Sequence, residues 1–346
     1  MQSSLIPNST LTALKGVRVG HATHPDKLTG CTVVLFDHAL PVAYQASGGG
    51  CATFNTDTLR AGSTFNHRHG LFIAGGSLSG LMSATPIMQE MIKQGIGDKM
   101  ANIINPSISG AVVFDLGTTI GQFDPNFGKE AYRNASTKTV ASGDVGAGTG
   151  TTVGKFAFLE NGTKHPGMKS GVGSARIDLG KGIMVCVLTV VNALGNVVNR
   201  DGTICAGNRD GKGSFLSFNS TKETPTTSST LGTNTTISIV GTNAKLPNRE
   251  EYERLARLAT HGQVRAIHPV QTGCDGDTVF LFSTEEVSVN ELGDQNDCNS
   301  RWPSLAIDKL GYSASQAAQD SIYDACNSSK TIPFAQALDG IIPSVR

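Results

Sequence analysis

The chain has 346 residues with 28 basic and 28 acidic side chains, so its formal net charge is zero, and only 16% of residues are charged. Neither a basic surface for nucleic acid nor an acidic tail is present, which favours a small-molecule partner. The longest apolar run, residues 182–198, is interrupted by Thr189, Asn192 and Asn196. It therefore predicts a buried strand followed by a turn and excludes a membrane-spanning helix.

The compartment stays open between cytoplasm and secretion. Residues 1–16 are polar and show no signal peptide, and the seven cysteines contain no Cys-x-x-Cys pair. Two features point the other way: Cys298 and Cys326 flank a polar C-terminal segment, and six Asn-x-Ser/Thr sequons occur, for example at Asn134 and Asn161. If the chain passes through an oxidising compartment, we expect a disulfide between Cys298 and Cys326.

The first half of the chain predicts sheet, one helix and more sheet. Short β-rich runs at 17–19, 31–36 and 41–44 alternate with turn residues, as in an antiparallel sheet. Residues 78–94 carry apolar side chains, including several methionines, at helical spacing, which predicts a helix whose stripe packs into the core. The uninterrupted apolar segment 110–117 predicts a strand buried on both faces.

The second half adds a second buried strand and a change of character. Residues 183–191 predict another strand buried on both faces, and Asp201-Gly202 a hairpin turn. Residues 217–233 are almost free of apolar side chains and predict a flexible linker. Order resumes abruptly at Thr235, with strands over 235–240 and 278–283 and an amphipathic helix over 249–266.

Three familiar motifs fail on spacing. Residues 150–155 resemble a phosphate-binding loop, but the first glycine is misplaced and Phe156 replaces the magnesium-binding hydroxyl. Residues 75–80 lack the spacing of a serine nucleophile elbow. His67 and His69 would share one strand face without a third ligand nearby, so we expect no metal site and no cofactor.

The informative stretch runs from Gly232 to Ala244, and a second acidic signature follows at Asp275-Gly276-Asp277. Here the chain resembles the nylon-oligomer (6-aminohexanoate-oligomer) hydrolases and, more broadly, the DmpA-type aminopeptidases and β-aminopeptidases. The resemblance also covers residues 16–21, 75–77, 111–115, 146–148 and Asn192. It implies an α+β fold, a four-layered α/β/β/α sandwich of the N-terminal-nucleophile type found in DmpA and ornithine acetyltransferase.

The same resemblance implies self-cleavage between Asn234 and Thr235. The single catalytic domain 1–346 would become an α-subunit, 1–234, and a β-subunit, 235–346, which assemble as a homo-oligomer, a dimer or tetramer of cleaved protomers. Carried residue by residue, the family pattern makes Thr235 the nucleophile, Lys155 an activating lysine and Asn192 a polar amide. It also gives two carboxylates, Asp275 and Asp277. Ser79 stands where nylon hydrolases carry a tyrosine whose phenol contacts the nucleophile, and this departure alters the substrate range that the resemblance implies.

Each residue type suits amide hydrolysis. The α-amine freed on Thr235 is a base on the nucleophile itself, and Lys155 would either accept the hydroxyl proton or stabilise negative charge. Asn192 interrupts an apolar strand, so its side-chain N–H is a candidate oxyanion donor. Asp275 and Asp277 would orient the Thr235 amine or bind a substrate ammonium. His261, in the helix after the nucleophile strand, is expected to be a packed core residue.

Three functions fit these residues. The first is a hydrolase of short peptides or aminoalkanoate oligomers. The second is an acyltransferase or cyclase that passes the acyl group from Thr235 to an amine instead of water. The third is a non-catalytic ligand-binding protein that has kept the fold, for which Lys155, Asn192 and Thr235 would occur together by chance.

Overall fold

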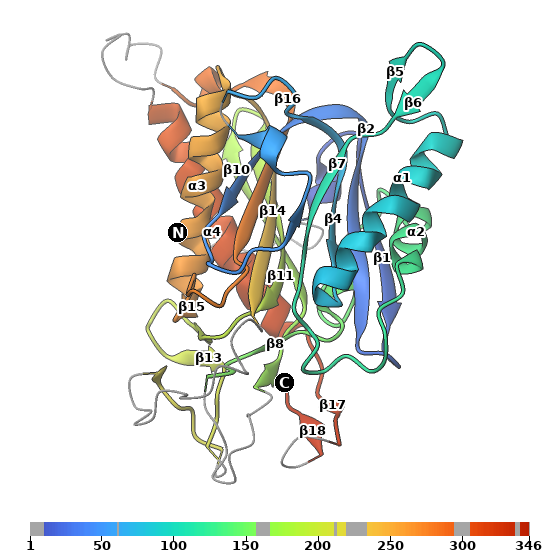
Figure 1. The fold of residues 1–346 in the computed structure, drawn as a ribbon. Coiled ribbons are helices and arrows are strands. Elements are labelled where there is room, and N and C mark those ends of the chain that lie inside the picture. Colours follow the sequence, from blue (N-terminus) through green and yellow to red (C-terminus); the bar gives the residue numbers. More distant parts are fainter. Residues whose placement is uncertain are drawn as a thin grey trace.

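The computed structural model describes residues 10–60, 62–156, 167–210, 213–218, 234–293, 305–335 and 340–345. Within these ranges the main feature is a nine-stranded sheet of order β10-β11-β14-β16-β2-β4-β7-β3, with β1 paired to β2 (Figure 1). Its strands are β1 Val17–His24, β2 Thr29–Ala46, β3 Thr53–Phe54, β4 His67–Ala74, β7 Ile108–Val112, β10 Val172–Gly180, β11 Ile183–Asn192, β14 Thr235–Lys245 and β16 Thr278–Ser288. Beyond Phe218, the predicted linker 217–233 lies outside the described residues.

The long strand β2 belongs to both halves of this sheet. Its residues 29–36 pair with β1, whereas its residues 42–46 pair with β16. The strand path therefore folds over, and the two halves pack face to face. Side chains from both halves meet in one apolar cluster, which includes Val34, Phe36, Leu188, Ile239 and Phe282.

Helices cover the two outer faces. Helices α3 (Arg249–Ala266) and α4 (Leu305–Asn327) pack on the half that contains β11, β14 and β16. Helices α1 (Ala84–Lys93) and α2 (Asn126–Arg133) pack on the half that contains β1, β4 and β7. The layers are thus α/β/β/α, as Figure 1 shows, and the predicted sandwich is confirmed.

Strand β11 shows how the sequence specifies its place between two apolar layers. Val185 and Val187 pack toward helices α3 and α4, whereas Cys186 and Leu188 pack toward the other half of the sheet. Successive side chains of a strand point to opposite faces, so an unbroken apolar run suits a strand covered on both sides. The predicted strand 183–191 is confirmed as β11. In place of the predicted strand 110–117 the structure has β7, which is shorter and both begins and ends earlier in the chain.

Helix α3 has the bounds that the sequence predicted. The side chain of Asn248 caps it by accepting a hydrogen bond from the Glu251 backbone N–H at 3.0 Å. Leu255 and Ala259 are buried against the sheet, but His261 is exposed. The expectation that His261 packs into the core is therefore wrong, because it falls on the helix face opposite Leu255.

The predicted helix 78–94 forms as two pieces. A 3₁₀ helix, η3 (Ser77–Ser83), leads into α1, where Ile87 and Met91 are buried. Leu78 and Met82 are 68% and 51% exposed, so the predicted core stripe is wrong for the first part. A 3₁₀ helix turns every three residues rather than every 3.6, and its side chains therefore leave the stripe that α1 continues.

Shorter elements complete the described chain. The strands are β5 Asp98–Met100, β6 Ile103–Asn105, β8 Thr152–Val153, β9 Met168–Lys169, β12 Asn196–Val198, β13 Ile204–Ala206, β15 Ile267–His268, β17 Ile332–Pro333 and β18 Ile341–Ile342. The other 3₁₀ helices are η1 Leu11–Ala13, η2 Asp57–Leu59, η4 Gly146–Gly148 and η7 Val289–Leu292. Strands β12 and β13 pair antiparallel around Asp201-Gly202, which confirms the predicted hairpin.

Two findings concern the compartment. Cys326 is a free, fully buried thiol in α4, while Cys298 lies outside the described residues, so the expected disulfide has no counterpart in the described structure. Among the helices that the structure describes, none is long and apolar enough to cross a membrane.

Candidate active site

Three strand ends meet at Thr235, the first residue of β14. On one side β14 pairs antiparallel with β11, and this register sets Thr235 opposite Asn192. On the other side β14 runs parallel to β16, and a bridge joins Asn234 to Asp275 just before that strand begins. Residues far apart in the sequence are therefore neighbours because the sheet aligns the ends of their strands.

The bond between Asn234 and Thr235 is buried and polarised. The hydroxyl of Thr235 donates to the carbonyl oxygen of Asn234 at 2.5 Å, and the backbone N–H of Gly276 donates to the same oxygen at 2.9 Å. Both Asn234 and Thr235 are less than 5% exposed. A Cβ atom on Gly276 would lie 3.0 Å from the Thr235 hydroxyl oxygen, so glycine gives this close approach the room that a larger residue would narrow.

Lys155 is held against Asn192. The ammonium nitrogen of Lys155 donates to the side-chain oxygen of Asn192 at 2.7 Å and to its backbone oxygen at 3.0 Å. The backbone N–H of Thr152 also donates to that side-chain oxygen, at 3.2 Å. Since Asn192 lies opposite Thr235 in the sheet, this arrangement brings a buried cation to the nucleophile's neighbour.

The amide nitrogen of Asn192 does not bond the scissile carbonyl. It donates to the backbone oxygen of Phe114 at 2.8 Å, whereas Gly276 bonds the oxygen of Asn234. In this structure the Asn234 oxygen thus accepts from the backbone N–H of Gly276, and the oxyanion role of the Asn192 amide stays a prediction. The Asp275-Gly276-Asp277 motif contained the signal, because a glycine between two acidic residues allows a close backbone approach.

Asp275 and Asp277 flank Gly276 and accept backbone hydrogen bonds. Asp277 accepts from the N–H groups of Thr236 at 2.6 Å and Gln271 at 2.9 Å, and Asp275 accepts from Thr272 at 2.8 Å. Burial, reinforced by the charge of Asp275, raises the pKa of Asp277 to about 7. Burial also raises the pKa of Asp275, although hydrogen bonds from Thr272 and the charge of Lys155 oppose the rise.

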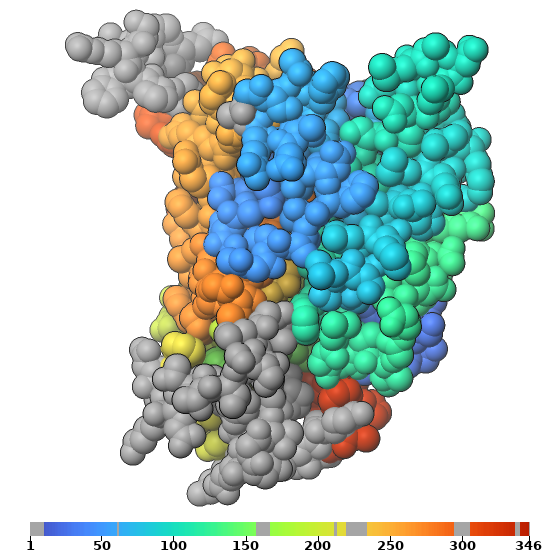
Figure 2. All heavy atoms as spheres, viewed as in Figure 1, coloured from blue at the N-terminus to red at the C-terminus, as the bar shows by residue number. Residues whose placement is uncertain are grey.

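A glycine-rich segment, residues 47–50, is joined to this acidic turn by backbone hydrogen bonds. The N–H groups of Ser47 and Gly48 donate to the Asp277 backbone oxygen at 2.9 and 3.2 Å, and the N–H of Gly50 donates to the Asp275 backbone oxygen at 2.8 Å. A Cβ on Gly48 would lie 2.0 Å from that Asp275 oxygen. In Figure 2 the blue N-terminal segment accordingly lies against the orange segment of the acidic turn.

Ser79 and the histidines take no part in this cluster. Ser79 lies in η3, half-buried, and among the described residues no hydrogen bond joins it to Thr235 or Lys155. His67 and His69 lie on β4, and within the described ranges no group of three or more His, Cys, Asp or Glu side chains is arranged to hold a metal ion.

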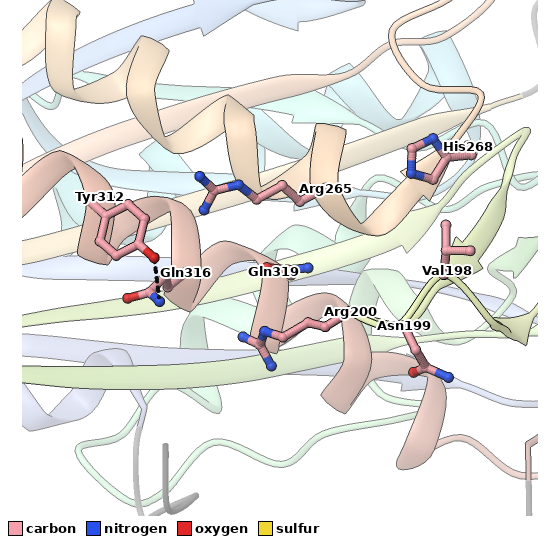
Figure 3. Close-up of a pocket in the computed structure, with 9 residues that line it drawn as sticks. Val198, Asn199, Arg200, Arg265, His268, Tyr312, Gln316 and Gln319 are labelled. Carbon is pink, nitrogen blue, oxygen red and sulfur yellow. Dashed lines mark hydrogen bonds between the residues drawn. The ribbon is translucent and has the colours of Figure 1, made fainter. Parts of the chain in front are cut away.

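An open cavity of about 650 Å³ lies elsewhere, against α3, α4 and β12. Figure 3 shows Arg200 and Arg265 along it, with Gln319 between them. None of the predicted site residues lines it, and Arg200 is already paired with Asp320 at 2.6 Å. Thr235, which is the predicted nucleophile, Lys155 and the two aspartates lie in the buried cluster and not at this surface cavity.

Solved structures define the class of fold. The chain superposes on the L-aminopeptidase D-Ala-esterase/amidase of Ochrobactrum anthropi, a variant of the Ntn hydrolase fold, with a TM-score of 0.69 at 16% identity over 100% of this chain and 93% of that chain. A Burkholderia sp. β-aminopeptidase gives a TM-score of 0.68 at 16% identity, covering 99% and 92%. The fold is therefore that of the N-terminal-nucleophile hydrolases.

The chain belongs to peptidase family S58, whose family model matches residues 9–338. An uncharacterized aminopeptidase of Mycobacterium leprae is 30% identical over 326 residues, which cover 83% of this chain and 82% of the relative. A 6-aminohexanoate-oligomer endohydrolase of Paenarthrobacter ureafaciens is 26% identical over 316 residues, covering 90% and 84%. The predicted family is confirmed, and the chain is an enzyme that hydrolyses amide or peptide bonds.

Proposed function

We propose that the chain cuts itself between Asn234 and Thr235 and then uses Thr235 as an N-terminal nucleophile on amide substrates. One observation carries the proposal: the Thr235 hydroxyl and the Gly276 N–H both bond the Asn234 carbonyl oxygen. The first places the nucleophile beside the group it attacks, and the second is a donor aimed at the oxygen where negative charge develops.

Self-cleavage proceeds by an acyl shift. The hydroxyl oxygen of Thr235 attacks the Asn234 carbonyl carbon and loses its proton, and the carbonyl oxygen becomes an oxyanion bonded by Gly276. The C–N bond then breaks, and the nitrogen takes up a proton to become the α-amine of Thr235. Water hydrolyses the remaining ester, which leaves a carboxylate on Asn234 and restores the Thr235 hydroxyl.

The same groups then serve turnover. The freed α-amine of Thr235, whose reference pKa is about 8, accepts the hydroxyl proton and later returns it to the leaving amine. Lys155 lies in the low-dielectric interior and bonds Asn192, the strand partner of Thr235, so it stabilises the negative charge of the intermediate. Asn192 orients that cation through its side-chain oxygen.

The acidic turn indicates the substrate class. Two buried carboxylates so close together favour cations nearby, and cleavage supplies one, because the Thr235 α-amine becomes an ammonium when it takes the hydroxyl proton. A substrate ammonium can satisfy the second, so the substrate is a short peptide or an aminoalkanoate oligomer with a free amine near the scissile bond. The relatives' names, aminopeptidase and 6-aminohexanoate-oligomer endohydrolase, agree with such substrates.

Intact-mass analysis of the purified protein tests the proposal. We expect two pieces, residues 1–234 and 235–346, and native mass spectrometry should show cleaved protomers assembled as a dimer or tetramer. The Thr235→Ala variant should stay uncut, whereas Thr236→Ala, which removes the adjacent buried hydroxyl, should still be cut. Two pieces of unchanged mass from the Thr235→Ala chain would refute the nucleophile.

A further inference from the structure

A second buried lysine lies near the site, and the steps above do not use it. Lys169, in β9, is 0% exposed and forms an ion pair with Asp144 at 2.7 Å. Its ammonium also donates to the backbone oxygens of Gly148 and Thr151, both at 3.2 Å, and of Ser170 at 2.5 Å. A buried ammonium is costly unless it is paired and fully hydrogen-bonded, and these four acceptors meet that requirement.

One peptide group connects Lys169 to the catalytic amide. The oxygen of the Thr151–Thr152 peptide accepts from Lys169, and the N–H of the same peptide donates to the side-chain oxygen of Asn192 at 3.2 Å. That oxygen is the atom that accepts from Lys155 at 2.7 Å. The two ammonium groups therefore lie at opposite ends of a short chain of hydrogen bonds.

A second connection reaches the backbone of the same strand. The hydroxyl of Ser170, whose carbonyl accepts from Lys169, donates to the backbone oxygen of Val191 at 2.5 Å. The N–H of Val191 donates to the oxygen of Gly171 at 3.0 Å. Val191 directly precedes Asn192. Segments bonded by Lys169 therefore contact both the Asn192 side chain, through Thr152, and the peptide that leads into Asn192, through Ser170.

Charge at one end of this chain affects the other. A cation on a peptide oxygen polarises the peptide and strengthens its N–H as a donor. A donor directed at Asn192 requires the amide oxygen, not the nitrogen, to face Lys155, and the nitrogen then faces Phe114. Burial lowers the pKa of Lys169, but the negative charge of Asp144 opposes this and favours the charged form.

We propose that Lys169 is a positioning residue for the Lys155 and Asn192 pair and acts through the peptide between Thr151 and Thr152. This inference rests on the proposed function, because it assigns Lys169 to the same two reactions, self-cleavage and turnover. Lys169 itself touches neither the scissile bond nor the substrate; it fixes the orientation of the Asn192 amide, and through it Lys155.

The test compares Lys169→Met with Arg68→Met. Arg68 is a matched control because it is another buried cation that serves backbone oxygens, those of Asn55, Phe65 and His67, in a different part of the sheet. We expect Lys169→Met to slow self-cleavage and to lower kcat roughly 10- to 100-fold with KM unchanged, as for other residues that orient a functional group. Arg68→Met should cleave at the wild-type rate.

A spectroscopic reading separates positioning from general stability. In uncut Thr235→Ala protein labelled with ¹⁵N-threonine, the Thr152 amide proton should shift upfield when Lys169→Met is added, because its bond to Asn192 weakens. Folded Lys169→Met that cleaves at the wild-type rate with an unshifted Thr152 signal would overturn the inference.

Two further outcomes keep the inference testable. If Lys169→Met does not fold, Asp144→Asn decides: it keeps the lysine but removes the carboxylate that holds its ammonium at the Thr151 oxygen, and we expect cleavage about fivefold slower, the effect of one hydrogen bond. A wild-type rate in Asp144→Asn would then overturn the inference. Cleavage of Thr235→Ala would instead refute the proposed function itself, whatever the Lys169 variants do.

Discussion

Two regions of the sandwich bury charge, and they treat it differently. Around Arg68 on β4, every partner is a neutral oxygen acceptor, and the guanidinium makes five hydrogen bonds, to Asn55, Thr58, Phe65, His67 and Ser109. Around Thr235, the side-chain oxygens Oδ1 of Asn234 and Asp275 are buried without a hydrogen-bond partner among the described residues. The pKa of Asp277 is raised to about 7 in the same place.

The difference separates structural charge from reactive charge. A buried network in which all groups are bonded holds a loop in place, and its removal costs stability. Burial displaces pKa values in both regions and, with the charge of Arg249, lowers the pKa of Arg68 to about 10. The second region differs in its buried polar groups without a partner in the described part of the chain, which are typical of sites that bind or react with something else. The region around Arg68 is therefore expected to affect folding alone, whereas the region around Thr235 should affect cleavage.

The largest loss of activity is expected when Lys155 or Asn192, in the region around Thr235, is replaced. We expect Lys155→Met and Asn192→Ala each to slow both self-cleavage and substrate turnover about 100- to 1000-fold, since one set of groups stabilises the charge that develops in both. Intact mass against time after cell-free synthesis measures the first reaction. Lys309→Met is a suitable control, because Lys309 is an exposed lysine on α4 that donates to the Leu292 carbonyl oxygen. Normal self-cleavage in both variants would contradict the shared site.

Adding a methyl group to Gly276 should have the next largest effect. The new Cβ would lie 3.0 Å from the Thr235 hydroxyl oxygen and 3.1 Å from its methyl carbon, so the Thr235 side chain or the turn must shift, and the two bonds to the Asn234 oxygen are disturbed. We expect cleavage to slow roughly 10- to 100-fold in Gly276→Ala. Gly273→Ala in the same turn is the matched control, because nothing lies within 4 Å of its Cβ position. Equal rates for the two variants would remove Gly276 from the mechanism.

Neutralising Asp277 should change which substrates are preferred. If the acidic turn binds a substrate ammonium, Asp277→Asn should raise KM about tenfold for amine-bearing amides and leave neutral esters nearly unchanged, because one charge-assisted hydrogen bond is lost. Steady-state kinetics on matched free and acetylated substrates measures the difference. Equal losses on both substrate types would assign Asp277 to positioning Thr235 instead.

The raised pKa of Asp277 also predicts a pH dependence of folding. The folded chain holds this proton up to about pH 7, whereas the ordinary value is 3.8, so the folded state binds more protons in between. Asp277 should therefore lower the free energy of unfolding progressively as the pH rises from about 4 to 7. In uncut Thr235→Ala protein, urea unfolding at pH 5 and pH 8 should show this loss, and adding Asp277→Asn should reduce it. Asp37→Asn, at an exposed carboxylate, is the control. If the free energy of unfolding changed equally between pH 5 and pH 8 in all three proteins, the prediction would be contradicted.

The smallest effect on cleavage is expected from Arg68→Met. Leaving several buried oxygens without a donor should lower the free energy of unfolding by about 3 kcal/mol, yet the rate of self-cleavage should stay within about twofold of wild type, as for exposed substitutions away from a site. Urea unfolding of the uncut chain and intact mass against time measure the two quantities. A large loss of cleavage in folded Arg68→Met would erase the distinction between the two regions.

Local signals were enough for much of the fold. Helix α3 was predicted with its observed bounds from its amphipathic pattern, which lies within the segment itself, and the structure adds the capping asparagine and the acidic residues of its first turn. Strands β11 and β14 were recognisable from unbroken apolar or β-branched runs. His261 and the pair Leu78 and Met82 were misjudged, because a residue's type does not say which way its helix faces.

By itself, the sequence determined the elements, the family and the set of residues that meet at Thr235. Only the tertiary structure decided where their polar groups are directed: the Asn192 amide donates to Phe114, the Gly276 N–H donates to the Asn234 oxygen, and Lys169 donates to the peptide whose N–H bonds Asn192. The physical reason is that hydrogen bonds depend on direction and on partners supplied by distant segments. Hydrophobic patterns and turn residues act within a few neighbours and can be recognised along the chain, whereas the aim of a backbone N–H exists only after the strands have paired.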